Sequence, residues 1–109
     1  MRYRTFGRTG WQVSKIGYGM WGLAGWTGAD DAATRQSLQL AVDLGCNFFD
    51  TALAYGEGRS EQFLGELVRA NPGKTLYVGT KVPPKNRQWP SRRGGDRCAT
   101  GRSAARAGR

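Results

Sequence analysis

Three short apolar runs recur in this chain about 30 residues apart, and helix-like segments separate them. The runs end near Gly19, at Asp50 and at Lys81. Strands that alternate with helices at this spacing build a parallel sheet with helices packed outside it. Right-handed connections bring the carboxyl ends of such strands to one side of the sheet. The repeat therefore predicts an α/β fold in which the residues at these three strand ends lie together.

The first helix-like segment covers residues 32–44. Asp30 or Asp31 is a suitable N-cap before it, and Gly45 after it is a typical glycine stop. Apolar residues recur inside it at helical spacing, which predicts one buried face. That face consists of Leu38, Ala41 and Val42.

The second helix is predicted over residues 61–70, with Ser60 as its cap. Its buried stripe is formed by Phe63, Leu64, Leu67 and Val68. Short apolar runs stand on either side of it, over residues 47–50 and 76–81, and we expect both to be buried parallel strands.

The amino-terminal residues predict a β-hairpin with arms over residues 3–6 and 11–14. A short strand ending near Gly19 follows. The glycines there have the spacing G-x-G-x-x-G, but the next residues cannot open a helix, which argues against a dinucleotide-binding Rossmann unit. Met20 and Trp21 stand at the end of this strand, where ordinary hydrophobic packing is slightly favoured over a role in a site.

The chain carries 17 Lys and Arg against 8 Asp and Glu, for a formal charge of +9. More than half of this excess lies in residues 91–109, where six arginines stand against Asp96 alone. The excess positive charge therefore lies mainly in the last nineteen residues and is not a property of the folded domain, and we predict no nucleic-acid partner.

No apolar run is long enough to span a membrane. Cys46 and Cys98 lack metal-ligand spacing, so no metal site is predicted, and we expect reduced thiols in a cytoplasmic protein.

Asp50, Tyr55 and Lys81 are the candidate chemical group at the strand ends. A lysine ammonium near a phenol lowers the pKa of the phenol and makes it a better proton donor. A carboxylate paired with that lysine keeps the ammonium charged and in place. Such a trio suits a carbonyl oxygen that gains negative charge. A buried Asp–Lys pair with a tyrosine packed beside it is an equally good interpretation of the spacing alone.

Several ordered motifs resemble the aldo-keto reductase family. They are Asn47 to Ala52, Tyr55-Gly56, Ser60-Glu61 with Leu64-Gly65, and Thr80-Lys81, preceded by Thr9-Gly10, Val13-Ser14 and Ile16 to Gly22. The resemblance runs from residue 1 to about residue 94. It implies an amino-terminal β-hairpin and the first three β/α units of a (β/α)8 TIM barrel.

The resemblance also implies a function. The family reduces aldehydes and ketones with NADPH, and its catalytic tetrad is Asp, Tyr, Lys and His. By resemblance, Tyr55 is the general acid, Lys81 lowers its pKa, and Asp50 anchors Lys81. Gly19, Met20 and Trp21, together with Asp50, are the residues expected to border the cofactor. The expected partner is a small aldehyde or ketone.

The chain also departs from the family. It contains no histidine, and its 109 residues fall well below the roughly 250 of a complete barrel. We expect residues 1–94 to form a partial barrel and residues 95–109 a disordered Arg/Ala/Gly-rich tail that arises from a shifted reading frame. We therefore expect no turnover from the chain alone. The alternative is a non-enzymatic accessory protein of the same fold, as in ion-channel accessory subunits.

Overall fold

A computed structural model describes residues 1–23, 28, 30–81 and, for the backbone, 104–107. Two short 3-10 turns, Gly7–Thr9 and Trp21–Leu23, follow β1 and β3. The strands and helices are β1 (Tyr3–Thr5), β2 (Gln12–Ser14), β3 (Tyr18–Gly19), α1 (Asp31–Asp43), β4 (Phe48–Asp50), α2 (Arg59–Ala70), β5 (Leu76–Gly79) and β6 (Ala104–Ala107).

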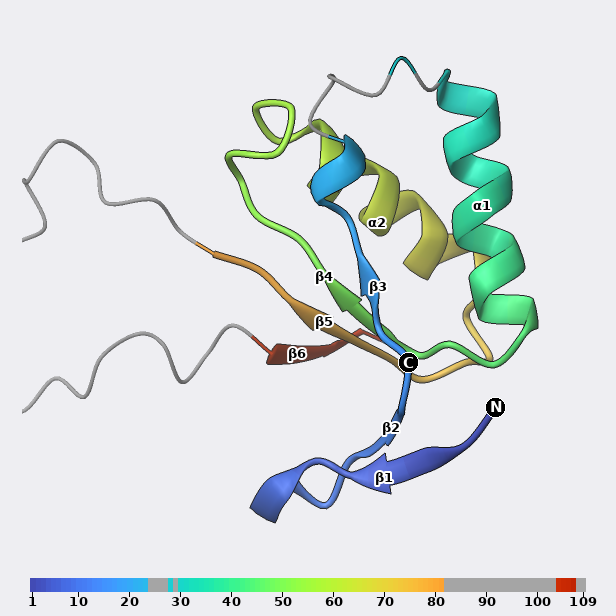
Figure 1. The fold of residues 1–109 in the computed structure, drawn as a ribbon, viewed down its shortest axis with the longest axis vertical. Coiled ribbons are helices and arrows are strands. Elements are labelled where there is room, and N and C mark those ends of the chain that lie inside the picture. Colours follow the sequence, from blue (N-terminus) through green and yellow to red (C-terminus); the bar gives the residue numbers. More distant parts are fainter. Residues whose placement is uncertain (24–27, 29, 82–103, 108–109) are drawn as a thin grey trace, which may run out of the picture.

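The strands form two sheets, and their directions match the sequence prediction. β1 and β2 pair as an antiparallel hairpin in which Arg4 lies opposite Val13. β3, β4 and β5 are parallel neighbours in that order. The predicted hairpin and parallel α/β arrangement are therefore confirmed (Figure 1).

Helix α1 begins and ends where its caps predict. The Asp30 carboxylate accepts a hydrogen bond from the Ala33 N–H at 2.6 Å, which satisfies one of the free donors of the first turn. Gly45 has a φ of +94°, a left-handed conformation that costs glycine little. Its N–H donates to the carbonyl of Val42 at 2.9 Å and ends the helix.

Helix α2 differs from the prediction at its start. Gly58, not Ser60, is the N-cap, and the helix begins at Arg59. Gly58 has a φ of +92°, and Gly56 and Glu57 before it also have positive φ. The chain thus enters α2 through three left-handed residues, so Ser60 lies inside the first turn and its hydroxyl is free for a different contact.

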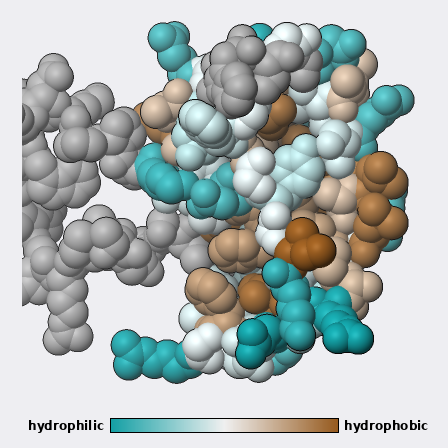
Figure 2. All heavy atoms as spheres, in the orientation of Figure 1, coloured by the Kyte–Doolittle hydropathy of each residue, from teal (hydrophilic) through white to brown (hydrophobic). Residues whose placement is uncertain are grey.

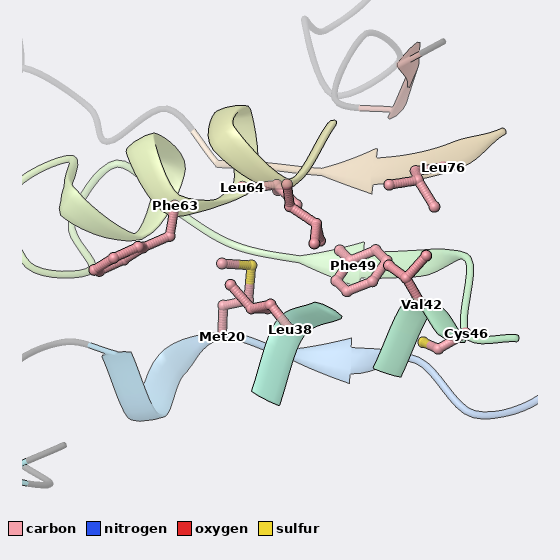
Figure 3. Packing of buried hydrophobic residues seen from close by; sticks show 9 residues of the cluster. Met20, Leu38, Val42, Cys46, Phe49, Phe63, Leu64 and Leu76 are labelled. Carbon is pink, nitrogen blue, oxygen red and sulfur yellow. The ribbon is translucent and has the colours of Figure 1, made fainter. Parts of the chain in front are cut away.

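The core lies between the two helices and the sheet (Figure 3). Phe49, at the centre of β4, is fully buried and packs among side chains from both helices. The predicted stripes of α1 and α2 supply most of the cluster, and Ala41 and Val68 pack at its margin. The core residues are Met20, Leu38, Val42, Cys46, Phe49, Phe63, Leu64, Leu67 and Leu76. Because strand residues alternate in direction, Phe48 and Asp50 stand on the opposite face of the sheet from Phe49.

The hairpin packs against that opposite face, near the amino ends of β4 and β5. Trp11 stacks on Tyr77 of β5 with ring centroids 4.8 Å apart, and Phe6 lies 5.5 Å from Phe48. Asn47 joins the hairpin to the start of β4: its side chain accepts from the Ser14 N–H at 2.7 Å and donates to the Gln12 carbonyl at 2.9 Å. These contacts fix the hairpin under one end of the sheet.

Strand β6 was not predicted. The composition of residues 95–109 favours disorder, yet Ala104–Ala107 pair with β5 in antiparallel register, with Leu76 opposite Ala107. The outer edge of β5 presents backbone N–H and C=O groups, and the backbone of a short extended segment can pair with them whatever its side chains. The rest of the tail and the predicted loop after Lys81 lie outside the described residues.

Candidate active site

Asp50 stands at the carboxyl end of β4 between two glycines. Its Cα partners are Gly19 on β3 and Gly79 on β5. A Cβ added at Gly19 would meet no atom of the described residues within 4 Å. The sheet surface on both sides of the Asp50 carboxylate is therefore free of side chains from the paired residues, and on the Gly19 side it borders open space.

Lys81 reaches back to Asp50 from just beyond β5. Its Nζ donates to both carboxylate oxygens, at 2.9 and 2.8 Å, and to the carbonyl of Thr51 at 3.1 Å. The hydrogen bond that the Lys81 ammonium donates to the Asp50 carboxylate raises the pKa of Lys81 above its ordinary value. Desolvation partly opposes this rise, and Tyr55 supports it. The ammonium therefore stays charged at neutral pH.

The Asp50–Lys81 pair is not buried. The two side chains are 51% and 55% exposed. Ion pairs open to solvent contribute little to stability, typically less than about 1 kcal/mol. The interpretation as a buried structural pair is therefore wrong for these residues, and stability does not explain why the charges are held together here.

Tyr55 lies in the loop between β4 and α2, and its ring lies close to the lysine. The Lys81 Nζ lies 5.5 Å from the centroid of the ring. The Tyr55 N–H donates to the carbonyl of Ala52 at 3.0 Å, which makes a tight turn directly after β4. The turn and the left-handed residues from Gly56 to Gly58 bring the phenol back over the strand ends. The structure thus brings together all three residues of the predicted trio.

The residues predicted to border a cofactor have three different surroundings. Met20 is fully buried in the core, so its side chain faces away from Asp50. This agrees with ordinary hydrophobic packing, which the sequence slightly favoured for Met20. Its backbone N–H donates to the carbonyl of Asp50 at 2.9 Å. Trp21 is 61% exposed. Gly19 borders the open side of Asp50. Gly19, Trp21 and Asp50 therefore keep atoms at the surface, whereas the Met20 side chain does not.

The sequence did not reveal a second ring of contacts around the trio. Thr51 and Ser60, both almost fully buried, place their hydroxyl oxygens 2.7 Å apart. The Thr80 hydroxyl donates to the carboxylate of Glu61. Thr51 follows Asp50, and Thr80 precedes Lys81, so both hydroxyls belong to neighbours of the charged residues. That adjacency was visible in the sequence, but their partners on α2 were not.

A shallow hollow of about 530 Å³ lies at the other end of the sheet. Tyr3, Gln12, Asn47 and Lys74 are among the residues that line it. It lies beside the start of β4 and β5, whereas Asp50 and Lys81 lie at the carboxyl ends. In parallel α/β folds ligands bind at the carboxyl ends of the strands, so chemistry favours the Asp50 end over this hollow.

The sequence profile of the Aldo/keto reductase family matches residues 15–103. The chain belongs to the aldo/keto reductase family. It is 37% identical to the aldo-keto reductase YhdN of Bacillus subtilis over 71 residues, which are 63% of this chain and 22% of that protein. It therefore spans less than a quarter of the length of this relative.

Two further comparisons extend the similarity. The chain is 39% identical over 69 residues to a probable voltage-gated potassium channel subunit beta of Oryza sativa, covering 63% of this chain and 21% of that protein. The aldo-keto reductase AKR11C1 of Bacillus halodurans, solved in its holo form, superimposes with a TM-score of 0.65 and 32% identity. That superposition covers 75% of this chain and 26% of the solved one.

In the described part of the chain, neither α1 nor α2 combines the length and the apolar character that a membrane crossing requires.

Proposed function

We propose that this chain is the amino-terminal part of an NADPH-dependent reductase of aldehydes and ketones. The observation that carries the proposal is the arrangement of Asp50, Tyr55 and Lys81 at the carboxyl ends of adjacent strands, with the ammonium hydrogen-bonded to the carboxylate and 5.5 Å from the phenol ring. The ion pair is half exposed, so its charges are accessible to a ligand.

Each residue of the trio has a role in this proposal. When bound, NADPH would supply the hydride that the carbonyl carbon of the substrate accepts. Tyr55 donates its phenolic proton to the carbonyl oxygen, which yields the alcohol and leaves a phenolate that takes a proton from water. The Lys81 ammonium stabilises the negative charge that develops on the phenol oxygen as the proton leaves. Asp50 holds the ammonium in place through two hydrogen bonds.

The surroundings of Asp50 suit a flat cofactor ring. Gly19 and Gly79 flank it in register, and space beside Gly19 is open. We assign Gly19, Trp21, Asp50 and the backbone of Met20 to the border of the nicotinamide. The buried free thiol of Cys46 agrees with a reducing compartment, so we place the protein in the cytoplasm.

The proposal also holds that β3–α1, β4–α2 and β5 are the first units of a (β/α)8 barrel. Leu40 and Leu44 on the outer side of α1 are 58% and 64% exposed, and Figure 2 shows an apolar surface over the lower part of this helix. A further unit packed against α1 would cover these side chains. The isolated chain has three parallel strands in its described part, and we expect no turnover from it.

A chimera tests the proposal. Residues 1–81 of this chain replace the matching segment of the Bacillus subtilis relative, and NADPH oxidation is followed with an aromatic aldehyde. We expect turnover from the chimera and a loss of at least about 100-fold in Tyr55→Phe, which removes the proton donor. Tyr18→Phe is the matched control, because the Tyr18 hydroxyl contacts Ser37 on α1, away from the trio. Equal activity of Tyr55→Phe and the parent would contradict the assignment.

The potassium-channel relative of Oryza sativa favours one alternative, a non-enzymatic accessory subunit of the same fold. Its identity of 39% over 69 residues is as high as that of the reductase relative. Under this alternative the cofactor would bind without turnover and a membrane protein would copurify. A chimera that binds NADPH but reduces no carbonyl compound would support it.

A further inference from the structure

The first turn of α2 touches every segment that carries a residue of the trio. The Ser60 hydroxyl lies 2.7 Å from that of Thr51, directly after Asp50. The Ser60 N–H donates to the carbonyl of Tyr55 at 3.2 Å. The Glu61 carboxylate accepts a hydrogen bond from Thr80, directly before Lys81. Two consecutive residues of one helix thus contact the neighbours of Asp50 and Lys81 and the backbone of Tyr55.

The contact between Ser60 and Thr51 is buried and is therefore part of the packed interior. Ser60 is completely buried and Thr51 is almost so, and each hydroxyl is the other's side-chain partner. A buried hydroxyl that loses its partner is costly, so the pair holds the backbone after Asp50 at a fixed distance from α2. α2 itself is anchored in the core by its buried stripe, including Phe63, Leu64 and Leu67.

The second contact, between Thr80 and Glu61, involves the segment directly after β5. Two bonds from the loop after β4 hold the backbone at the end of β5 and just beyond it. The Thr51 N–H donates to the carbonyl of Gly79 at 2.8 Å, and the Leu53 N–H donates to the carbonyl of Lys81 at 3.3 Å. Neither bond involves the side chain of Thr80. The Thr80 hydroxyl bonds Glu61 on α2, and the next side chain, Lys81, reaches Asp50.

We propose that Ser60 and Glu61 are positioning residues that set the separation of Asp50 and Lys81 and keep both beside Tyr55. They act through Thr51 and Thr80 and do not touch the reacting atoms. The proposal rests on the proposed function of the trio, but it concerns the geometry of the pair and can be tested without turnover.

The test is an NMR titration of the Lys81 side chain in the 109-residue protein, with isotope-labelled lysine and assignment by Lys81→Arg. Asp50 on β4 and Tyr55 in the following loop are the titratable groups that act on this ammonium. Asp50→Asn provides the reference, because it removes the partner that raises the pKa of Lys81. Amide spectra of each variant report whether the fold is retained.

We expect Thr80→Val, which removes the hydroxyl without changing any charge, to lower the pKa of Lys81 by a large part of the drop seen in Asp50→Asn. Thr80→Ser keeps the hydroxyl and should titrate like the parent. Glu61→Ala should act like Thr80→Val, and Glu61→Gln, which keeps an acceptor, should have the smaller effect. Thr51→Val tests the Ser60 contact in the same way.

A merely structural role would lower thermal stability in these variants and leave the titration of Lys81 unchanged. Unchanged titration in Thr80→Val, Thr51→Val and Glu61→Ala, with a clear drop in Asp50→Asn, would overturn the positioning proposal while the trio stands. No drop in Asp50→Asn would overturn the ion pair and its positioning together. A loss of carbonyl reduction in the chimera with normal titrations here would refute the proposed function alone.

Discussion

The two ends of the parallel sheet differ in the kind of contact that their side chains make. At the amino end, the contacts join neutral groups. The Asn47 side-chain amide hydrogen-bonds the backbone of the hairpin, and Trp11 stacks on Tyr77. At the carboxyl end, a half-exposed ion pair lies beside a phenol. Neutral hydrogen bonds and stacked rings contribute to stability, whereas an exposed ion pair contributes little. The amino end therefore serves folding, and the carboxyl end is available for chemistry.

The largest effect should follow from loss of the aromatic contact at the amino end. Trp11→Ala removes a ring stacked between Phe6 and Tyr77 and should lower the free energy of unfolding by about 3 kcal/mol. Leu53→Ala, in the loop at the carboxyl end, truncates a side chain that is already partly exposed and should cost less than about 1 kcal/mol. Urea unfolding of both variants measures the difference, and equal losses would erase the distinction between the two ends.

Asn47→Ala should have the next largest effect. It leaves the Ser14 N–H and the Gln12 carbonyl without their partner and should cost about 1–3 kcal/mol. Gln12→Ala is the matched control, because the Gln12 side chain bonds only the exposed Thr5 hydroxyl among the contacts the structure gives. If both variants unfold at the same urea concentration, the Asn47 bridge does not hold the hairpin.

The carboxyl end should tolerate loss of its charges. Lys81→Met, which keeps much of the side-chain length, should change the free energy of unfolding by less than about 1 kcal/mol, because the Asp50–Lys81 pair is half exposed. The same substitution in the chimera should abolish most carbonyl reduction. If Lys81→Met lowered the free energy of unfolding as much as Asn47→Ala does, the Asp50–Lys81 pair would have a structural role.

The smallest effect concerns pH. The pKa of Lys81 is raised above its ordinary value of 10.5 in the folded chain. The stability that this pair contributes is therefore fully present below 10.5 and is lost as the pH rises through the raised folded pKa. Thermal unfolding between neutral pH and pH values above 10.5 should show this loss in the parent. Asp50→Asn should lack that component, and identical alkaline profiles would contradict the linkage.

The sequence predicted the elements whose signals are local. The period of α1, its Asp30 cap and the Gly45 stop all act within one segment, and the structure has them in place. The gathering of Asp50 and Lys81 could also be predicted, because parallel topology alone carries strand ends to one side. Local signals and the general rule for parallel sheets sufficed for these features.

Other features depend on contacts that no single segment encodes. Ser60 has the chemistry of an N-cap, but its hydroxyl is used by Thr51, and a left-handed glycine caps α2 instead. β6 forms because the edge of β5 is open, which composition does not reveal. The burial of Met20 follows from the packing of α1 and α2 over β3, so one of the predicted cofactor residues offers only its backbone.

The central claim is that Tyr55, supported by Lys81 and Asp50, donates the proton in carbonyl reduction. The most direct measurement is the rate of NADPH-dependent aldehyde reduction by the chimera that carries residues 1–81, compared between the parent and Tyr55→Phe. We expect turnover in the parent and a loss of at least about 100-fold in Tyr55→Phe, with NADPH binding retained. Equal rates in the two proteins would contradict it.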